Sequence, residues 1–101
     1  MIVTVATFNE TAADLQEGIR HVKEEVVPSI RGAKGVVAGY WVTDVERGQR
    51  LSIVVWESAE AMSAVMSGVM TSVKRLRQEG GRDQPQRSPD STQRYQVIAQ
   101  V

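Results

Sequence analysis

The sequence predicts an α+β fold with the element order β-α-β-β-α-β, in which a four-stranded antiparallel sheet carries two helices on one face. Three observations predict it: four segments of strand-like composition or alternation, two segments with apolar residues at helical spacing, and a short polar loop between two adjacent strands. A chain of 101 residues has the typical size of one domain, so we expect a single domain over residues 1–101.

The first strand and the first helix come at the N-terminal end. Ile2 to Phe8 is apolar and mostly β-branched, which predicts a strand. Asn9 or Thr11 then caps a helix, because either side chain can accept a hydrogen bond from the first free N–H groups. The apolar stripe of this helix consists of Leu15, Ile19, Val22 and Val26. Pro28 is predicted to end or bend the helix.

A hairpin is predicted next. Residues 35–43 (GVVAGYWVT) are rich in valine and aromatic residues, as is typical of a strand. The polar stretch DVERGQR, with Gly48 near its tip, leads to another strand at residues 50–57. Two adjacent strands joined by a short loop should pair antiparallel.

The second helix and the last strand complete the order. Ser58 is predicted to cap this helix, which runs to about Gln78. Its apolar stripe is formed by Met62, Val65, Met66, Val69, Val73 and Leu76. Residues 79–92 are rich in glycine, proline and charge, and we expect them to form a flexible loop or lid. Residues 93–101 alternate polar and apolar side chains and are predicted to form the fourth strand.

This order is that of ferredoxin-like folds, and the sheet face without helices is the informative one. In the third strand Ile53 points to the opposite side from Trp56, and both sides of that strand are apolar. An apolar face of this extent is rarely left exposed on a monomer. We therefore expect a homodimer in which two copies pack these faces together.

Charge and composition exclude several classes of function. The 12 basic and 12 acidic residues give zero formal charge, so no overall field attracts nucleic acid or an anionic membrane. Cysteine is absent, and the single histidine, His21, excludes a His-rich metal site within one chain. The N-terminus (MIVTVATF) lacks a secretory pattern, and no apolar stretch approaches the roughly 20 residues of a bilayer span. We expect a cytoplasmic protein.

Several segments together are similar to those of a known family. They are a first strand that ends in Asn9, the segment GVVAGYW at residues 35–41, the hairpin, and VVWESAEAM at residues 54–62. Over nearly its whole length the chain thus resembles the antibiotic biosynthesis monooxygenase family. The resemblance implies a dimeric α+β barrel with a cavity between each sheet and its helices. For an enzymatic member it implies oxygenation of aromatic polyketide-like substrates or haem, without flavin or a conventional metal site.

The resemblance does not extend to the haem-degrading branch of the family. That branch uses an asparagine at the end of the first strand, a tryptophan early in the second helix and a histidine further along it as iron ligand. Asn9 matches the first, but the predicted helix from Ser58 to about Gln78 contains neither tryptophan nor histidine. We therefore expect no haem, no other cofactor and no metal.

Asn9 and Trp56 are the catalytic candidates. Oxygenation without a cofactor needs an apolar pocket and fixed donors for a developing oxyanion, and amide and indole N–H groups keep their protons near neutral pH. A helix cap also explains Asn9, and core packing also explains Trp56. These structural interpretations are favoured over the catalytic ones.

The candidates for substrate binding are Trp41, Tyr40, Met62 and Met66. Trp41 and Tyr40 point to opposite faces of their strand, so only one of them can face a given cavity. The methionines, together with Met70, could line a tunnel for a flat aromatic ligand, and adaptable filling of the core is the favoured alternative.

Two charged features complete the candidates. His21 lies off the apolar stripe and is expected to be a solvated surface residue rather than a base. The basic cluster KRLR at residues 74–77, followed by Arg82 and Arg87, could hold a phosphate or a carboxylate, and a solvated helix end explains it as well.

Two functions remain open. The first is a small-molecule-binding homodimer that acts as a cofactor-independent monooxygenase on an aromatic or quinol-type substrate. The second is a non-catalytic ligand-sensing or protein-assembly module of the same fold. A cavity lined by Asn9 and a tryptophan favours the first function, whereas a cavity filled by side chains favours the second.

Overall fold

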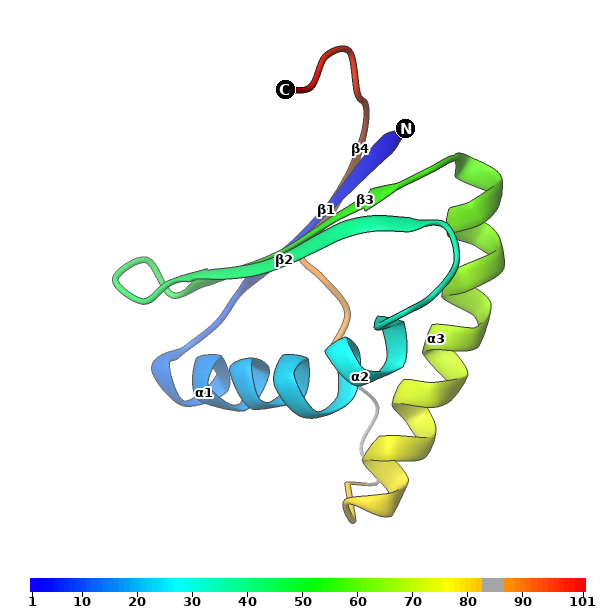
Figure 1. Cartoon of the computed structure of the whole chain (residues 1–101). Coiled ribbons are helices and arrows are strands. Elements are labelled where there is room, and N and C mark those ends of the chain that lie inside the picture. Colours follow the sequence, from blue (N-terminus) through cyan, green and yellow to red (C-terminus); the bar gives the residue numbers. More distant parts are fainter. Residues whose placement is uncertain (83–86) are drawn as a thin grey trace.

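The computed structural model describes residues 1–82 and 87–101, and it confirms the predicted fold class. The sheet consists of β1 (Ile2–Asn9), β2 (Val36–Asp44), β3 (Gln49–Trp56) and β4 (Ser91–Gln96). Its spatial order is β2-β3-β1-β4, and all neighbours are antiparallel. The helical segments lie on one side of it: α1 (Ala12–His21), the π-helical turn η1 (Val22–Val26), α2 (Val27–Ile30) and α3 (Ala59–Glu79) (Figure 1).

The first helical stretch runs without interruption from α1 through η1 to α2. Thr11, rather than Asn9, caps it, since the side-chain oxygen of Thr11 accepts a hydrogen bond from the N–H of Asp14. In η1 the N–H of Val27 bonds the carbonyl of Val22, which widens the turn directly before Pro28. A proline within a regular α-helix clashes with the carbonyl four residues earlier. The wider turn therefore lets the helix continue beyond Pro28 and end at Ile30.

The predicted hairpin is confirmed, and its turn depends on Gly48. This residue has a φ of +65°, in the left-handed region that favours glycine. A Cβ at Gly48 would lie 2.5 Å from the carbonyl oxygen of Glu10. The N–H of Glu10 donates to the carbonyl of Gly48 at 2.7 Å. The hairpin turn is thus tied to the chain that leaves β1.

The fourth strand is shorter than predicted, because it covers residues 91–96 instead of 93–101. It pairs with β1, and its last residue, Gln96, lies opposite Ile2. The N–H of Val97 makes one further bond, to the carbonyl of Met1. The alternation in the sequence thus continues beyond the residues that pair with β1.

The core lies between the sheet and the helices. It is a cluster of Ile30, Val54, Trp56, Val69 and Val73. Trp56 is 1% exposed, which confirms the core-packing interpretation of this residue. Ser58 caps α3 as predicted, since its side-chain oxygen accepts a hydrogen bond from the N–H of Ala61. Val69 and Val73 of the predicted apolar stripe are buried.

The opposite face of the sheet, here called the outer face, carries no helix among the described residues (Figure 1). Its apolar side chains are Val3, Val5, Ala38, Tyr40, Val42, Leu51, Ile53, Val55 and Tyr95. Ile53 lies near its middle, opposite Val5 on one side and Tyr40 on the other. Within residues 1–82 and 87–101, no helix combines the length and the apolar character that a membrane crossing requires.

Candidate functional site

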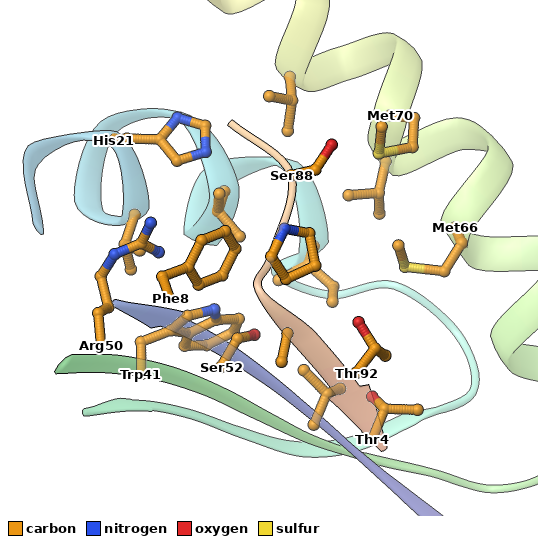
Figure 2. A pocket seen from close by; sticks show the side chains of 18 of the residues that line it. Thr4, Phe8, His21, Trp41, Arg50, Ser52, Met66, Met70, Ser88 and Thr92 are labelled. Atoms are coloured by element: carbon orange, nitrogen blue, oxygen red, sulfur yellow. The ribbon is translucent and has the colours of Figure 1, made fainter. Parts of the chain in front are cut away.

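A cavity of about 440 Å³ lies between the inner face of the sheet, the first helical stretch and α3 (Figure 2). Pockets for small ligands typically measure about 300–1,000 Å³, so this one can hold such a molecule. Residues 87–89 also line it. The predicted lid at residues 79–92 therefore reaches the cavity with its last part, while its residues 83–86 lie outside the described residues.

Trp41 faces the cavity and Tyr40 does not. Trp41 pairs with Ser52 on the inner face, whereas Tyr40 lies on the outer face and is 61% exposed. The Trp41 ring covers Gly39, where an added Cβ would come within 2.7 Å of a ring carbon. No hydrogen bond of the Trp41 indole N–H occurs among the described residues, and none of their buried side-chain nitrogens or oxygens lacks a partner. This N–H is therefore accessible rather than sealed in the core.

Trp56 also borders the cavity, but its indole N–H already makes a hydrogen bond within the protein. The indole N–H of Trp56 donates to the side-chain oxygen of Thr4 at 2.9 Å. An oxyanion of a ligand would have to displace this bond before Trp56 could stabilise it. Of the two tryptophans, Trp41 is thus better placed as a donor, and the catalytic role of Trp56 stays a prediction.

Asn9 lies at the end of β1 and is not among the described residues that line the cavity. Strand alternation turns it away from the side of Phe8, and its amide oxygen accepts a hydrogen bond from Gln49 at 3.2 Å. Its backbone N–H donates to Asp90 at 2.7 Å, and its carbonyl accepts from Arg87 at 2.6 Å. In this position Asn9 anchors the segment that enters β4, and its catalytic role stays a prediction.

Three methionines of α3 line the cavity: Met62, Met66 and Met70. Figure 2 shows Met66 and Met70 pointing from α3 into it. Both are exposed, so the favoured interpretation of them as core filling is wrong, whereas Met62 packs against the core cluster. Flexible and polarisable thioether side chains suit a wall that adapts to a flat aromatic ligand.

A buried ion pair forms one end of the cavity. Arg50 of β3 donates to the carboxylate of Glu10 at 2.8 Å, and both side chains are buried. The guanidinium carbon of Arg50 lies 4.0 Å from the centroid of the Phe8 ring. Gly18 of α1 leaves room for the Arg50 side chain, because a Cβ at Gly18 would lie 2.5 Å from Arg50 Nε. No local pattern indicates this pair, since its members are 40 residues apart in the chain.

His21 belongs to a second polar cluster, so the prediction of a solvated His21 is wrong. Its side chain is 13% exposed, and its Nδ1 lies 2.5 Å from Oε1 of Glu25. Glu25 is 1% exposed and is also bound by Arg77 at 3.1 Å and Arg82 at 2.8 Å. The arginines assigned to a solvated helix end or an anion site thus neutralise an internal carboxylate. The spacing of His21 and Glu25, four residues apart on one helix, is the sequence signal that indicates their contact.

The ionisation of this pair follows from its surroundings. Burial would raise the pKa of Glu25, but the hydrogen bonds from His21 and the two arginines outweigh it and lower the pKa to about 2. Burial lowers the pKa of His21, and the carboxylate of Glu25 offsets only part of that effect. Near neutral pH, Glu25 is therefore ionised and His21 is neutral. A carboxylate only accepts hydrogen bonds, so Nδ1 of His21 carries the ring proton and Nε2 carries the lone pair.

Comparisons with known protein sequences identify two relatives over part of the chain. No protein-family model matches it. Uncharacterised proteins of Mycobacterium tuberculosis, from strain H37Rv and from strain CDC 1551 / Oshkosh, are each 34% identical over 58 residues, which is 57% of this chain. The match covers 26% of each relative, so the chain spans about a quarter of their length.

Solved structures share the architecture over the whole chain. The haem degrader MhuD of Mycobacterium tuberculosis, with two haems bound in its active site, has a TM-score of 0.72 at 14% identity, covering 100% of this chain and 99% of its own. A monooxygenase from the gene ActVA-Orf6 of Streptomyces coelicolor, in complex with nanaomycin D, has a TM-score of 0.71 at 17% identity, covering 99% and 89%. An antibiotic biosynthesis monooxygenase-like protein of Deinococcus radiodurans has a TM-score of 0.71 at 15% identity, covering 100% of this chain and 96% of its own. The chain therefore has the ferredoxin-like α+β fold of antibiotic biosynthesis monooxygenase-like proteins.

Proposed function

We propose that the chain forms a homodimer that binds a planar aromatic or quinol-type molecule in the cavity and oxygenates it without flavin, haem or metal. The observation that carries this proposal is the composition of the cavity wall. Trp41, Phe8 and the methionines of α3 supply flat and adaptable apolar surface, and Ser52 and Thr92 add a few hydroxyl groups. Structural neighbours bind haem and nanaomycin D, which supports a small-molecule site in this fold.

The chemistry places specific demands on the ligand and on the wall. Without a cofactor the ligand itself is the reductant, and it reacts with dioxygen once a hydroxyl group has lost its proton. The protein then has to hold the ring, exclude water and offer a fixed donor to the oxyanion. The accessible indole N–H of Trp41 meets the last demand.

Anthrone, quinols and haem are the test compounds. Tryptophan fluorescence measures their binding, and oxygen uptake measures their turnover. We expect anthrone and quinols to quench the fluorescence, because Trp41 lines the cavity, and to consume oxygen. We further expect Met66→Glu to weaken binding at least about tenfold, since it places a carboxylate against an apolar ligand. The matched control is Ser67→Glu, which adds the same charge at an exposed neighbouring position of α3.

The outcomes of this screen separate the two functions. Saturable quenching with oxygen uptake supports the monooxygenase. Quenching without turnover favours the non-catalytic ligand-sensing module, and absence of quenching by every compound contradicts a ligand site in this cavity. Haem is expected to show no binding through α3, because that helix contains no histidine.

The homodimer is proposed from the apolar outer face. We expect Ile53→Lys to convert a dimer into a monomer in analytical ultracentrifugation, because the dimer would have to bury an unpaired ammonium group near the middle of that face. Thr71→Lys, at an exposed position of α3, should leave the dimer intact. A wild-type chain that sediments as a monomer would contradict the proposed assembly.

A further inference from the structure

We propose that His21, oriented by Glu25, is the base that takes a proton from the ligand, and that the ligand is accordingly a planar aromatic with a phenolic or enolic hydroxyl facing the first helical stretch. This inference deepens the proposed function and rests on it.

The cavity wall contains few side chains that could act as a base. Among the described residues that line it, the charged or titratable side chains are His21, Arg50 and Arg87. Arginine stays protonated in proteins and cannot accept a proton. His21 is therefore the side chain of this wall that can act as a base near neutral pH.

The imidazole ring of His21 is held in one orientation. The contact of Nδ1 with the buried carboxylate of Glu25 holds the ring and leaves the lone pair on Nε2. Figure 2 shows the ring at the helical side of the cavity, with the edge away from its Cβ turned toward Ser88 and Phe8. A carboxylate that fixes one nitrogen while the other meets the substrate is the arrangement that orients a histidine base in many hydrolytic sites.

Charged groups from three parts of the fold surround the ring. On its own helical stretch the ionised Glu25 stabilises the imidazolium, and Arg20 lies 3.6 Å from the same carboxylate. From α3, Arg77 lies 3.4 Å from Nδ1, and Arg82 beyond α3 also binds Glu25. From the sheet, Arg50 adds a further positive charge. Burial is the largest cause of the lowered pKa of His21, and the charges of Arg77 and Arg50 lower that pKa further. Once the proton moves, these cations favour the oxyanion left on the ligand.

The proton transfer needs only the ligand hydroxyl and His21. The O–H bond of the ligand breaks, the proton forms a bond to Nε2, and the electron pair stays on the ligand oxygen. Glu25 remains ionised and pairs with the imidazolium. Dioxygen, the co-reactant of the proposed function, acts only afterwards, on the anion.

The test compares alizarin, a hydroxylated anthraquinone whose visible absorbance changes when it ionises, with anthraquinone, which has no hydroxyl group. We expect the wild-type chain to bind both and to lower the apparent pKa of bound alizarin by about one unit or more relative to buffer. In His21→Gln, which keeps an N–H donor for Glu25, we expect both compounds to bind and most of this shift to disappear. Lys23→Gln, at an exposed position of η1, is the matched control and should titrate like the wild type.

A second measurement uses the wild-type chain alone, in case His21→Gln does not fold. Calorimetric titration of alizarin in two buffers with different ionisation enthalpies counts the protons that leave the complex. The titration is made at a pH at which free alizarin is neutral and the absorbance shows bound alizarin to be ionised. If His21 keeps the proton, almost none is released there, whereas one proton released per bound anion overturns the proposal.

The remaining outcomes distinguish this inference from the proposed function. If neither compound binds, the proposed ligand site is wrong, and the proposed role of His21 as a base is wrong as well. If both bind but alizarin titrates as it does in buffer, or equally in His21→Gln and the wild type, the cavity stands and His21 is not its base.

Discussion

Replacement of Trp56 by alanine should lower the free energy of unfolding by about 3–5 kcal/mol, as measured by urea or thermal denaturation. The ring is 1% exposed within a cluster that includes Val54 and Val69, so its removal leaves a large internal void. The side-chain oxygen of Thr4 also loses its donor. Because small domains are stable by only about 5–15 kcal/mol, this single change removes a large share of the total.

Trp41→Ala is the matched control for this experiment. It removes the same ring from the neighbouring strand, but Trp41 is only partly buried and borders the cavity rather than the centre of the core. We expect Trp41→Ala to cost less stability and to weaken ligand binding more. The opposite pattern, in which Trp56→Ala keeps its melting temperature and loses the ligand, would overturn the assignment of Trp56 to the core.

Replacement of Glu25 by alanine should have an effect of similar size, about 3–5 kcal/mol, because it leaves partly buried cations without their carboxylate. Glu25 binds Arg77 and Arg82, and it also holds His21. Glu24→Ala is the matched control, since the neighbouring glutamate is exposed and its ion pair with Arg20 should contribute less than about 1 kcal/mol. Equal losses in the two variants would show that the internal cluster contributes no more than a surface pair.

Glu25 also predicts a specific dependence of stability on acid. Its pKa is lowered from 4.5 to about 2 in the folded chain, so the folded state favours the ionised form. The resulting stabilisation is fully present above a pH of about 4.5 and is lost as the pH falls from there through about 2. The urea midpoint of the wild type should therefore fall more steeply across this window than that of Glu25→Gln. Parallel curves would contradict the assignment.

The elements of the fold could be predicted because each has a local cause. The helix caps Thr11 and Ser58 and the glycine at the hairpin turn depend on residues close by in the chain. The alternation of Ile53 and Trp56 to opposite sides of β3 follows from strand geometry. The end of β4 depends instead on its pairing with a strand distant in the sequence, β1, so the length of β4 could not be predicted from its own alternation.

The polar interior could not be predicted for a similar reason. Thr4 and Trp56 are 52 residues apart, and Glu25 and Arg82 are 57 apart, and no local pattern pairs them. The apolar stripe predicts a surface position for His21, because His21 lies off that stripe. Hydrophobic spacing does not indicate a buried carboxylate four residues further on. The spacing of charged groups along one helix is the signal that would have corrected the assignment.

The π-helical turn at residues 22–26 has a consequence for how this chain is aligned with others. Each residue of an α-helix rotates the chain by about 100°, so one additional residue in a wide turn changes which side chains before and after it share a face. Leu15 before the turn and Ile30 after it are both buried. A relative with a regular helix here would be one residue shorter, and a correct alignment places a single-residue gap between positions 22 and 26. An alignment without that gap would keep the residues up to His21 in place but shift Val27 and the residues after it by one position, onto the wrong side of the relative's helix.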